Sequence, residues 1–178
     1  MPGGWLSFSS YHEEILIQKK HIQQELFAVH PQAERFVISS MGSELNADHI
    51  DYEEESVHDL RTLAMRFLGV PYLWGGRSFN GLDCSGFVQI VFKCLGRVLP
   101  RDASQQVKEG KAISFEQISE GDLVFFESDF KVTHVGIALN HSKIIHAHGS
   151  VRLDDLNKKG IFNVDRQELS HHYHSARR

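Results

Sequence analysis

The chain has 178 residues, which suits one ordinary domain, or one domain with a fragment of another. Hydrophobic residues make up 41% and charged residues 24%, as in globular proteins, and no apolar run approaches the ~20 residues that a membrane helix needs. The formal net charge of -4 and the lack of a basic block make nucleic acid an unexpected partner.

Residues 1–50 do not have the pattern of a complete domain. Short strands are predicted at 5–8 and 35–38, while 13–26 fits a strand or a helix. The acidic stretch 48–55 indicates a linker. The start lacks the charged and apolar regions of a signal peptide, so the chain as written is expected in the cytoplasm. A trimmed or truncated product would instead belong to the cell envelope.

Two amphipathic helices are predicted next. The first opens near Ser56, a candidate N-cap, and its apolar residues recur at helical spacing up to Leu68, before Gly69 and Pro71. The second runs over 84–98, ahead of Pro100. Strands are then predicted at 121–126, 133–139, 143–148 and 161–164. Helices followed by an antiparallel meander predict the α+β class.

Both cysteines, Cys84 and Cys94, are predicted to be free thiols, since a disulfide framework needs more of them at wider spacing. Cys84 starts the second helix, where unpaired N–H groups and the helix dipole favour a thiolate and lower the thiol pKa. Its neighbours are small and polar, whereas Cys94 lies on an apolar stripe and is expected to be a buried core residue. Cys84 is therefore the candidate nucleophile.

A nucleophilic cysteine needs a base, and His134 is the candidate. It lies on an otherwise apolar strand, and alternation places it on the face of Gly136 and Ala138, which leave room for a partner. From spacing alone, a structural strand histidine is the slightly favoured interpretation. The histidines at 171, 172 and 174, near the C-terminus, are expected to be solvated.

A third group usually orients the base, and the next predicted strand offers two candidates. His146 and His148 share one face by alternation. A three-residue turn at 140–142 would set His148 opposite His134, with His146 as the diagonal neighbour. Pattern alone does not separate them.

Several sequence blocks resemble the signature of NlpC-type cell-wall cysteine peptidases, over about residues 58–170. These blocks are Pro71-Tyr72-x-Trp74-Gly75-Gly76, Gly81-x-Asp83-Cys84-Ser85-Gly86-Phe87-Val88, Leu99-Pro100-Arg101-Asp102-Ala103-Ser104-Gln105-Gln106, Gly121-Asp122-Leu123-Val124-Phe125-Phe126, Thr133-His134-Val135-Gly136-Ile137 and Ile145-His146-Ala147. Gly4-Trp5 and Gly42-Ser43-x-Leu45 more weakly resemble the end of a bacterial SH3-like domain. The expected organisation is a partial SH3-like region at 1–50 and a peptidase domain at 51–178.

The resemblance implies a papain-like α+β fold and cleavage of the bond between γ-D-glutamate and a diamino acid, commonly meso-diaminopimelate, in peptidoglycan stem peptides. It implies a role in cell-wall turnover or murein peptide recycling, no cofactor or metal, and a monomer. Cys84 would be the nucleophile, His134 the base and His146 the orienting residue. Tyr72 would help to hold the oxyanion. The implied substrate-binding residues are Trp74, Asp83, Ser85, Arg101 and Asp102.

These roles suit the side chains. The Tyr72 hydroxyl can donate to an oxyanion, and Arg101 can grip the α-carboxylate of D-glutamate bidentately. Asp102 can hold the free amine of an N-terminal L-alanine, or it can be a helix N-cap. Trp74 can equally be a core residue.

Other functions remain open from the sequence. Relatives of this fold include amidases and acyltransferases, and an inactive wall-binding module is a further alternative. A zinc site built from Cys84 and histidines has little support, because neither CxxC nor HExxH spacing occurs in the sequence.

Overall fold

The computed structural model divides into two compact units, residues 1–56 and 57–178. The residues it describes are 20–22, 27–32, 35–41, 44–46 and 59–178. In the first unit, two antiparallel pairs are described: β1 (Lys20–Ile22) with β4 (Glu44–Asn46), and β2 (Phe27–Gln32) with β3 (Arg35–Ser40). The strand expected at 5–8 and the SH3-like positions Gly4, Trp5, Gly42 and Ser43 lie outside the described residues, so the SH3-like resemblance stays a prediction.

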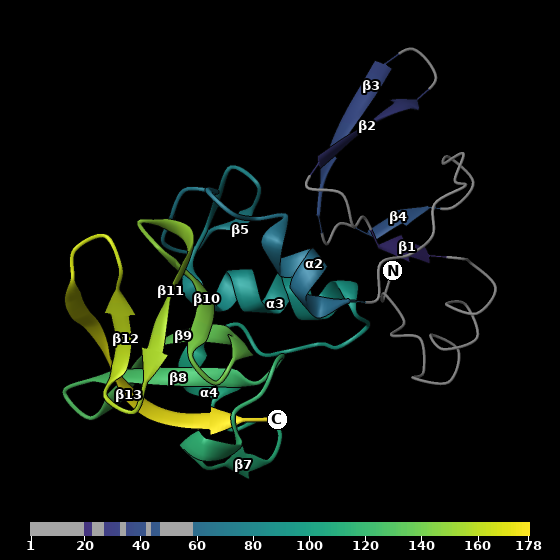
Figure 1. The fold of residues 1–178 in the computed structure, drawn as a ribbon. Coiled ribbons are helices and arrows are strands. Elements are labelled where there is room, and N and C mark those ends of the chain that lie inside the picture. Colours follow the sequence, from purple (N-terminus) through teal and green to yellow (C-terminus); the bar gives the residue numbers. More distant parts are fainter. Residues whose placement is uncertain (1–19, 23–26, 33–34, 42–43, 47–58) are drawn as a thin grey trace. The chain divides into compact units, whose positions relative to one another are not determined.

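A closed antiparallel barrel dominates the second unit (Figure 1). Its strands are β8 (Leu123–Ser128), β9 (Lys131–Asn140), β10 (Lys143–His148), β11 (Ser150–Asn157), β12 (Gly160–Asn163) and β13 (Glu168–Arg177). They follow the order β12-β11-β10-β9-β8-β13, and β12 also pairs with β13, which closes the ring. The short strand β7 (Ala112–Ile113) adds to the edge of β13, and β5 (Arg77–Ser78) pairs separately with β6 (Gly81–Leu82).

The predicted α+β, papain-like arrangement of helices followed by an antiparallel sheet is wrong for this chain. The described part of the second unit is mostly β, and its helices are short. They are α2 (Leu60–Met65), α3 (Cys84–Cys94), α4 (Ala103–Gln106) and the 3-10 turn η2 (Phe115–Gln117). The four strands predicted after residue 120 correspond to β8, β9, β10 and β12. The pattern missed β11 and β13, whose polar residues hide the alternation, and these two strands complete the barrel.

Helix α3 positions the start of the candidate site. It begins after Asp83, whose Oδ1 accepts the N–H of Gly86 at 2.7 Å. This satisfies one of the donors that a helix leaves unpaired at its N-terminus. The helix packs against β9 and β10, and Phe87 meets Phe67 edge-to-face with ring centroids 5.9 Å apart. Both phenyl rings are fully buried, which contributes about 1.5–3 kcal/mol each and joins α3 to the segment that follows α2.

Helix α2 is also capped by an aspartate. The Asp59 Oδ2 accepts the N–H of Thr62 at 2.8 Å, so Asp59 is the N-cap rather than the predicted Ser56. Over the part of the chain that the structure describes, no helix has the length and apolarity required to cross a membrane.

Candidate active site

Cys84 lies at the junction between the helix and the barrel. It is the first residue of α3, as predicted, and it is 7% exposed. Its Sγ is 4.0 Å from the carbonyl oxygen of Thr133 on β9. The thiol therefore lies next to the backbone beside His134. The N–H of Val135, on the other side of His134, favours the thiolate.

Burial raises the pKa of the Cys84 thiol, and the charge of Asp83 acts in the same direction. The N–H groups of Val135 and Ser85 oppose this rise by favouring the thiolate, but they do not outweigh it. The N–H groups at the helix terminus thus act in the expected direction, but burial outweighs them and the net shift of the thiol pKa is upward. The resting thiol keeps its proton, and attack on a carbonyl requires a base to remove it.

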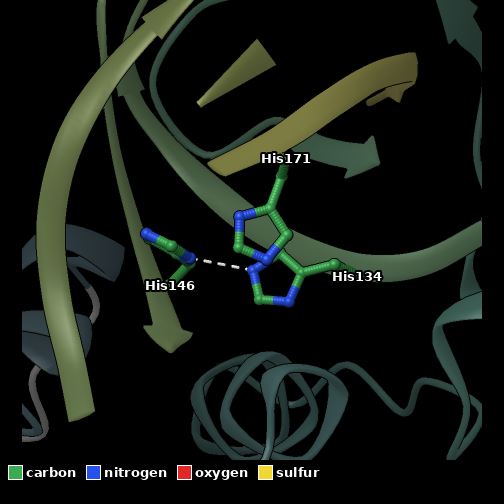
Figure 2. Close-up of side chains that lie close together, drawn as sticks. All are labelled: His134, His146 and His171. Carbon is green, nitrogen blue, oxygen red and sulfur yellow. Dashed lines mark hydrogen bonds between the residues drawn. The ribbon is translucent and has the colours of Figure 1, made fainter. Parts of the chain in front are cut away.

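His134 lies on β9 in the barrel and is joined to a second histidine. Its Nε2 is 2.8 Å from Nδ1 of His146 on β10, the dashed bond in Figure 2. The other nitrogen of His146, Nε2, is 3.0 Å from Oδ2 of Asp154 on β11. All three side chains are buried. Three neighbouring strands thus hold a continuous hydrogen-bonded chain from His134 to a carboxylate.

The structure separates His146 from His148. Asn140 pairs with Lys143, so the predicted three-residue turn is wrong, but a bulge between Lys143 and Ile144 restores the predicted register. Ile145 lies opposite Ile137, and continuing this register sets His148 opposite His134. The hydrogen bond is nevertheless made by the diagonal neighbour, His146. Gly136 makes this possible, because a Cβ there would lie 2.9 Å from the Cβ of His146. The small residue next to the base thus leaves the room that the sequence analysis expected.

Both rings of the His134–His146 pair are neutral near pH 7. Burial lowers the pKa of His134 well below its usual range, and the nearby His146, His171 and His148 add to this effect. Burial also lowers the pKa of His146, although its hydrogen bond to Asp154 acts in the opposite direction. The resting site therefore pairs a neutral thiol with a neutral imidazole.

His171 belongs to this cluster, contrary to the expectation that it is solvated. It lies on β13, is half-buried, and its ring stacks on that of His134 with centroids 4.1 Å apart (Figure 2). Burial lowers its pKa to about 3, and the neighbouring His146 adds to the shift. His172 and His174 are exposed, as expected. The sequence carried no sign of this role, because β13 was not recognised as a strand.

The rings of His134, His146 and His171 form the one group in the described residues whose donor atoms are close enough to suggest a metal site. One ligand nitrogen from each lies within 4.8 Å of the others. The His134 and His171 rings are nearly parallel, at 24°. Their lone pairs therefore lie in separate parallel planes, and one ion does not fall in both. Since Nε2 of His134 and Nδ1 of His146 already bond each other, this arrangement fits a proton relay better than a metal centre.

A charged cluster lies on the helix side of Cys84. Arg101 Nη1 donates to Asp83 Oδ1 and to Ser85 Oγ, each at 3.0 Å, and Nη2 forms an ion pair with Asp83 Oδ2. Gly75 N–H also donates to Asp83 Oδ2, at 2.9 Å. Asp83 and Ser85 are buried, whereas Arg101 is partly exposed. Three of the predicted substrate-binding residues thus form one network around the start of α3.

The remaining predicted residues lie around this cluster. Asp102 is exposed at the N-cap position of α4, and its N–H donates to Gln105 Oε1 at 3.3 Å, which supports the capping interpretation. Trp74 is 85% exposed, which excludes a core role. Tyr72 is half-buried, and burial, followed by the charges of Cys84 and Asp83, raises its pKa. Its hydroxyl therefore remains a donor at neutral pH.

The sequence analysis missed Asp154, Arg152 and His171. Asp154 lies in a segment with three charged residues, Arg152, Asp154 and Asp155, a pattern typical of a solvated loop. In the structure it is a barrel strand, and Asp154 is fully buried.

Known proteins resemble the part of the chain that contains the candidate site. The chain is 38% identical over 117 residues to a γ-D-glutamyl-L-lysine dipeptidyl-peptidase of Bacillus subtilis (strain 168), covering 64% of this chain and 38% of that protein. It is 34% identical over 120 residues to the bifunctional muramidase/DL-endopeptidase CwlT of the same organism, covering 65% of this chain and 36% of that one. The chain thus spans little more than a third of the length of these curated relatives.

The fold is also found in a crystal structure of an NlpC/P60 family protein from Bacillus cereus ATCC 10987. The TM-score is 0.72 at 24% identity, covering 93% of this chain and 66% of that one. The family model described as the NlpC/P60 family matches residues 69–177. The peptidase names among its relatives support the predicted hydrolase class. The predicted resemblance is confirmed: this chain belongs to the NlpC/P60 family.

Proposed function

We propose that this chain is a cysteine peptidase that hydrolyses the bond between γ-D-glutamate and a diamino acid in peptidoglycan stem peptides. The observation that carries the proposal is the neutral Cys84 thiol lying against the backbone around His134, whose ring is held by His146. A nucleophile, a base and an orienting group are the parts that acyl transfer requires. Residues 51–178 supply them all, and residues 1–50 are proposed as a partial SH3-like region.

The reaction begins with proton transfer from Cys84. Because Nε2 of His134 is engaged by His146, its Nδ1 is the nitrogen that accepts the thiol proton. The thiolate forms a bond to the γ-carbonyl carbon of D-glutamate, and the carbonyl electron pair moves to oxygen. Tyr72 donates its hydroxyl to this oxyanion, a contribution worth about 10²–10³ in rate in comparable sites.

The intermediate collapses when His134 returns the proton. Nδ1–H protonates the amine of the diamino acid as the C–N bond breaks, which leaves a thioester between Cys84 and the γ-carbonyl. Water, deprotonated by the same nitrogen, then attacks the thioester. The peptide carboxylate leaves and Cys84 regains its proton, so one base serves both halves of the reaction.

The helix side of the site is proposed to hold the substrate. Arg101 presents its outer N–H groups to the α-carboxylate of D-glutamate while Asp83 and Ser85 keep the guanidinium in place. The exposed Trp74 offers an apolar surface beside the cleft, and Asp102 offers a carboxylate for a free N-terminal amine. We propose meso-diaminopimelate as the diamino acid and cell-wall turnover or murein peptide recycling as the setting.

Mass spectrometry of reaction products tests this function. The protein is incubated with L-Ala-γ-D-Glu-meso-diaminopimelate, the L-lysine analogue, an N-acetylated form and a longer crosslinked stem. The expected products are L-Ala-D-Glu and the free diamino acid, absent with Cys84→Ser. Slower turnover of the acetylated peptide would support binding of the N-terminal amine by Asp102. Equal rates would show that Asp102 does not have this role.

Two other results would replace the proposal. Cleavage at a different amide, or transfer of the acyl group to an added amine in preference to water, would indicate an amidase or acyltransferase. Binding of the peptides with no Cys84-dependent product would indicate a wall-binding module.

A further inference from the structure

The carboxylate at the end of the histidine chain is completely enclosed by donors. Asp154 Oδ2 accepts from His146 Nε2 at 3.0 Å and from Arg152 Nε at 2.8 Å. Its Oδ1 accepts from Arg152 Nη2 at 2.9 Å and from the N–H of Val164 at 3.0 Å. Asp154 has no exposed surface. Burial favours the protonated acid, but the hydrogen bonds from His146, Arg152 and Val164 outweigh it and hold the pKa at about 2.

An ionised carboxylate fixes the direction of every hydrogen bond in the chain. Asp154 only accepts, so the proton of a neutral His146 lies on Nε2. His146 Nδ1 is then bare, and it accepts from Nε2–H of His134. A neutral His134 that carries its proton on Nε2 has a bare Nδ1. This is the tautomer that can accept the proton of Cys84.

Without the carboxylate, the same two rings have a second arrangement. His146 could carry its proton on Nδ1 and donate to Nε2 of His134, at the same 2.8 Å separation. His134 would then carry its proton on Nδ1 and have no lone pair for the thiol. The two arrangements share one heavy-atom geometry, so the position of the protons alone decides whether His134 is a base.

We infer that Asp154 is a positioning residue of this site, which acts through His146 to keep His134 in the tautomer with a bare Nδ1. Arg152 assists by gripping both oxygens of Asp154, and it is itself held by Asp165 at 2.7 Å. The carboxylate also stabilises the positive charge that forms on His134 when it accepts the thiol proton.

The residues that hold this carboxylate come from two neighbouring strands, β11 and β12, which pair with each other. Arg152 and Asp154 lie on β11, whereas Val164 and Asp165 follow β12 in the connection to β13. Pairing of β10 with β11, and of β11 with β12, therefore aligns the carboxylate with the imidazole chain. A histidine pair on an open two-stranded ribbon would have no such constraint.

The tautomers can be observed directly in the wild-type protein. Long-range proton–nitrogen NMR of protein labelled with ¹⁵N-histidine at pH 7 distinguishes a protonated from a bare ring nitrogen, and His134→Gln and His146→Gln variants assign the signals. The inference expects protons on Nε2 of both rings and bare Nδ1 atoms. A proton on Nδ1 of His134 would overturn it.

Kinetics with the diamino-acid peptide give a second test, which rests on the proposed function. Asp154→Ala is expected to lower kcat by about 100-fold or more, with KM within a factor of about two, because base catalysis contributes ~10²–10⁴. The matched control is Asp122→Ala. Asp122 is also buried and paired with an arginine, Arg178, at 2.9 Å, and no hydrogen bond joins it to a histidine in the part of the chain that the structure describes. Equal losses of kcat in the two variants would overturn the inference.

The proposed function and the role of Asp154 can be refuted independently of each other. If the wild-type protein cleaves no stem peptide, the proposed function is wrong, while the tautomers still test the role of Asp154. If Asp154→Ala does not fold, the wild-type spectrum alone decides. In a folded Asp154→Ala variant, the His134 signals are expected to show a proton on Nδ1, a change that a merely structural role would not produce.

Discussion

The candidate site has a barrel side, with His134, His146 and Asp154, and a helix side, with Asp83 and Arg101. The two sides differ in how far their charged groups are exposed to solvent. On the barrel side, His134 and His146 are buried neutral rings, and the carboxylate of Asp154, which is bonded to His146, is buried among hydrogen-bond donors. On the helix side, Asp83 and Arg101 form an ion pair that is open to solvent at the guanidinium. The barrel side suits controlled proton transfer, and the helix side suits recognition of a charged ligand. Substitutions on the two sides should therefore separate kcat from KM.

Cys84, the proposed nucleophile, lies between the two sides, so its replacement should have the largest effect. Cys84→Ser is expected to lower kcat by on the order of 10³-fold or more, because a serine hydroxyl is far less acidic than a thiol. Binding of the peptide should persist, since the helix side is intact. Product assays and equilibrium binding measure the two quantities. Cys94→Ser is the control, and a comparable loss of activity there would contradict the assignment.

On the barrel side, His146 should also be sensitive to replacement. His146→Ala is expected to lower kcat by about 100-fold, because His134 loses the partner that orients its ring. His146→Asn and His146→Gln should keep part of the activity, since an amide can still accept a hydrogen bond. Steady-state kinetics and melting temperatures check both effects.

His148→Ala is the matched control for that experiment. His148 has its ring parallel to that of His146 at 6.2 Å, and no hydrogen bond from it to His134 is found among the described residues. Its replacement should be milder. If His148→Ala lost more activity than His146→Ala, the hydrogen bond between His134 and His146 would not be the contact that orients the proposed base.

The helix side should respond through KM. Arg101→Lys is expected to raise KM by about tenfold with a smaller change in kcat, because lysine lacks the planar fork that contacts both Asp83 and Ser85. The control is Arg61→Lys, since Arg61 pairs with Glu120 away from the site. An effect confined to kcat would show that Arg101 acts in the chemical step rather than in substrate recognition.

The neutral histidines should also make the fold sensitive to acid. The pKa of His171 falls from about 6.5 in the unfolded chain to about 3 in the fold, mainly through burial. The unfolded state binds the extra proton first, so stability is complete above pH 6.5 and is lost as pH falls toward 3. Thermal denaturation between pH 7 and pH 4 should show a decline of a few degrees from this residue.

His171→Phe sharpens that test. A phenyl ring can keep the stacking on His134 but does not titrate, so this variant should lose less stability between pH 7 and pH 4 than the wild type. His134 and His146, whose pKa values burial also lowers, should account for the decline that remains. An identical decline in both proteins would show that His171 is not responsible.

Local sequence indicated the two proposed reacting groups. Asp83 and Cys84 place a capping residue directly before a candidate nucleophile at a helix start, and these signals need no distant partner. Strand alternation similarly placed His134 beside Gly136, with space for another ring. Such features depend on backbone geometry over a few residues, and so they can be inferred before the fold is known.

Only the tertiary structure decided the barrel, the choice of His146 and the presence of Asp154 and His171. Strand closure depends on pairing between β12 and β13, and β11 and β13 have polar residues where alternation would require apolar ones. A buried polar side chain is stabilised by partners that arrive from other strands, as Arg152 and Val164 do for Asp154. Before those strands meet, Asp154 and His171 have the sequence signature of solvated residues, because the contacts that bury them are long-range.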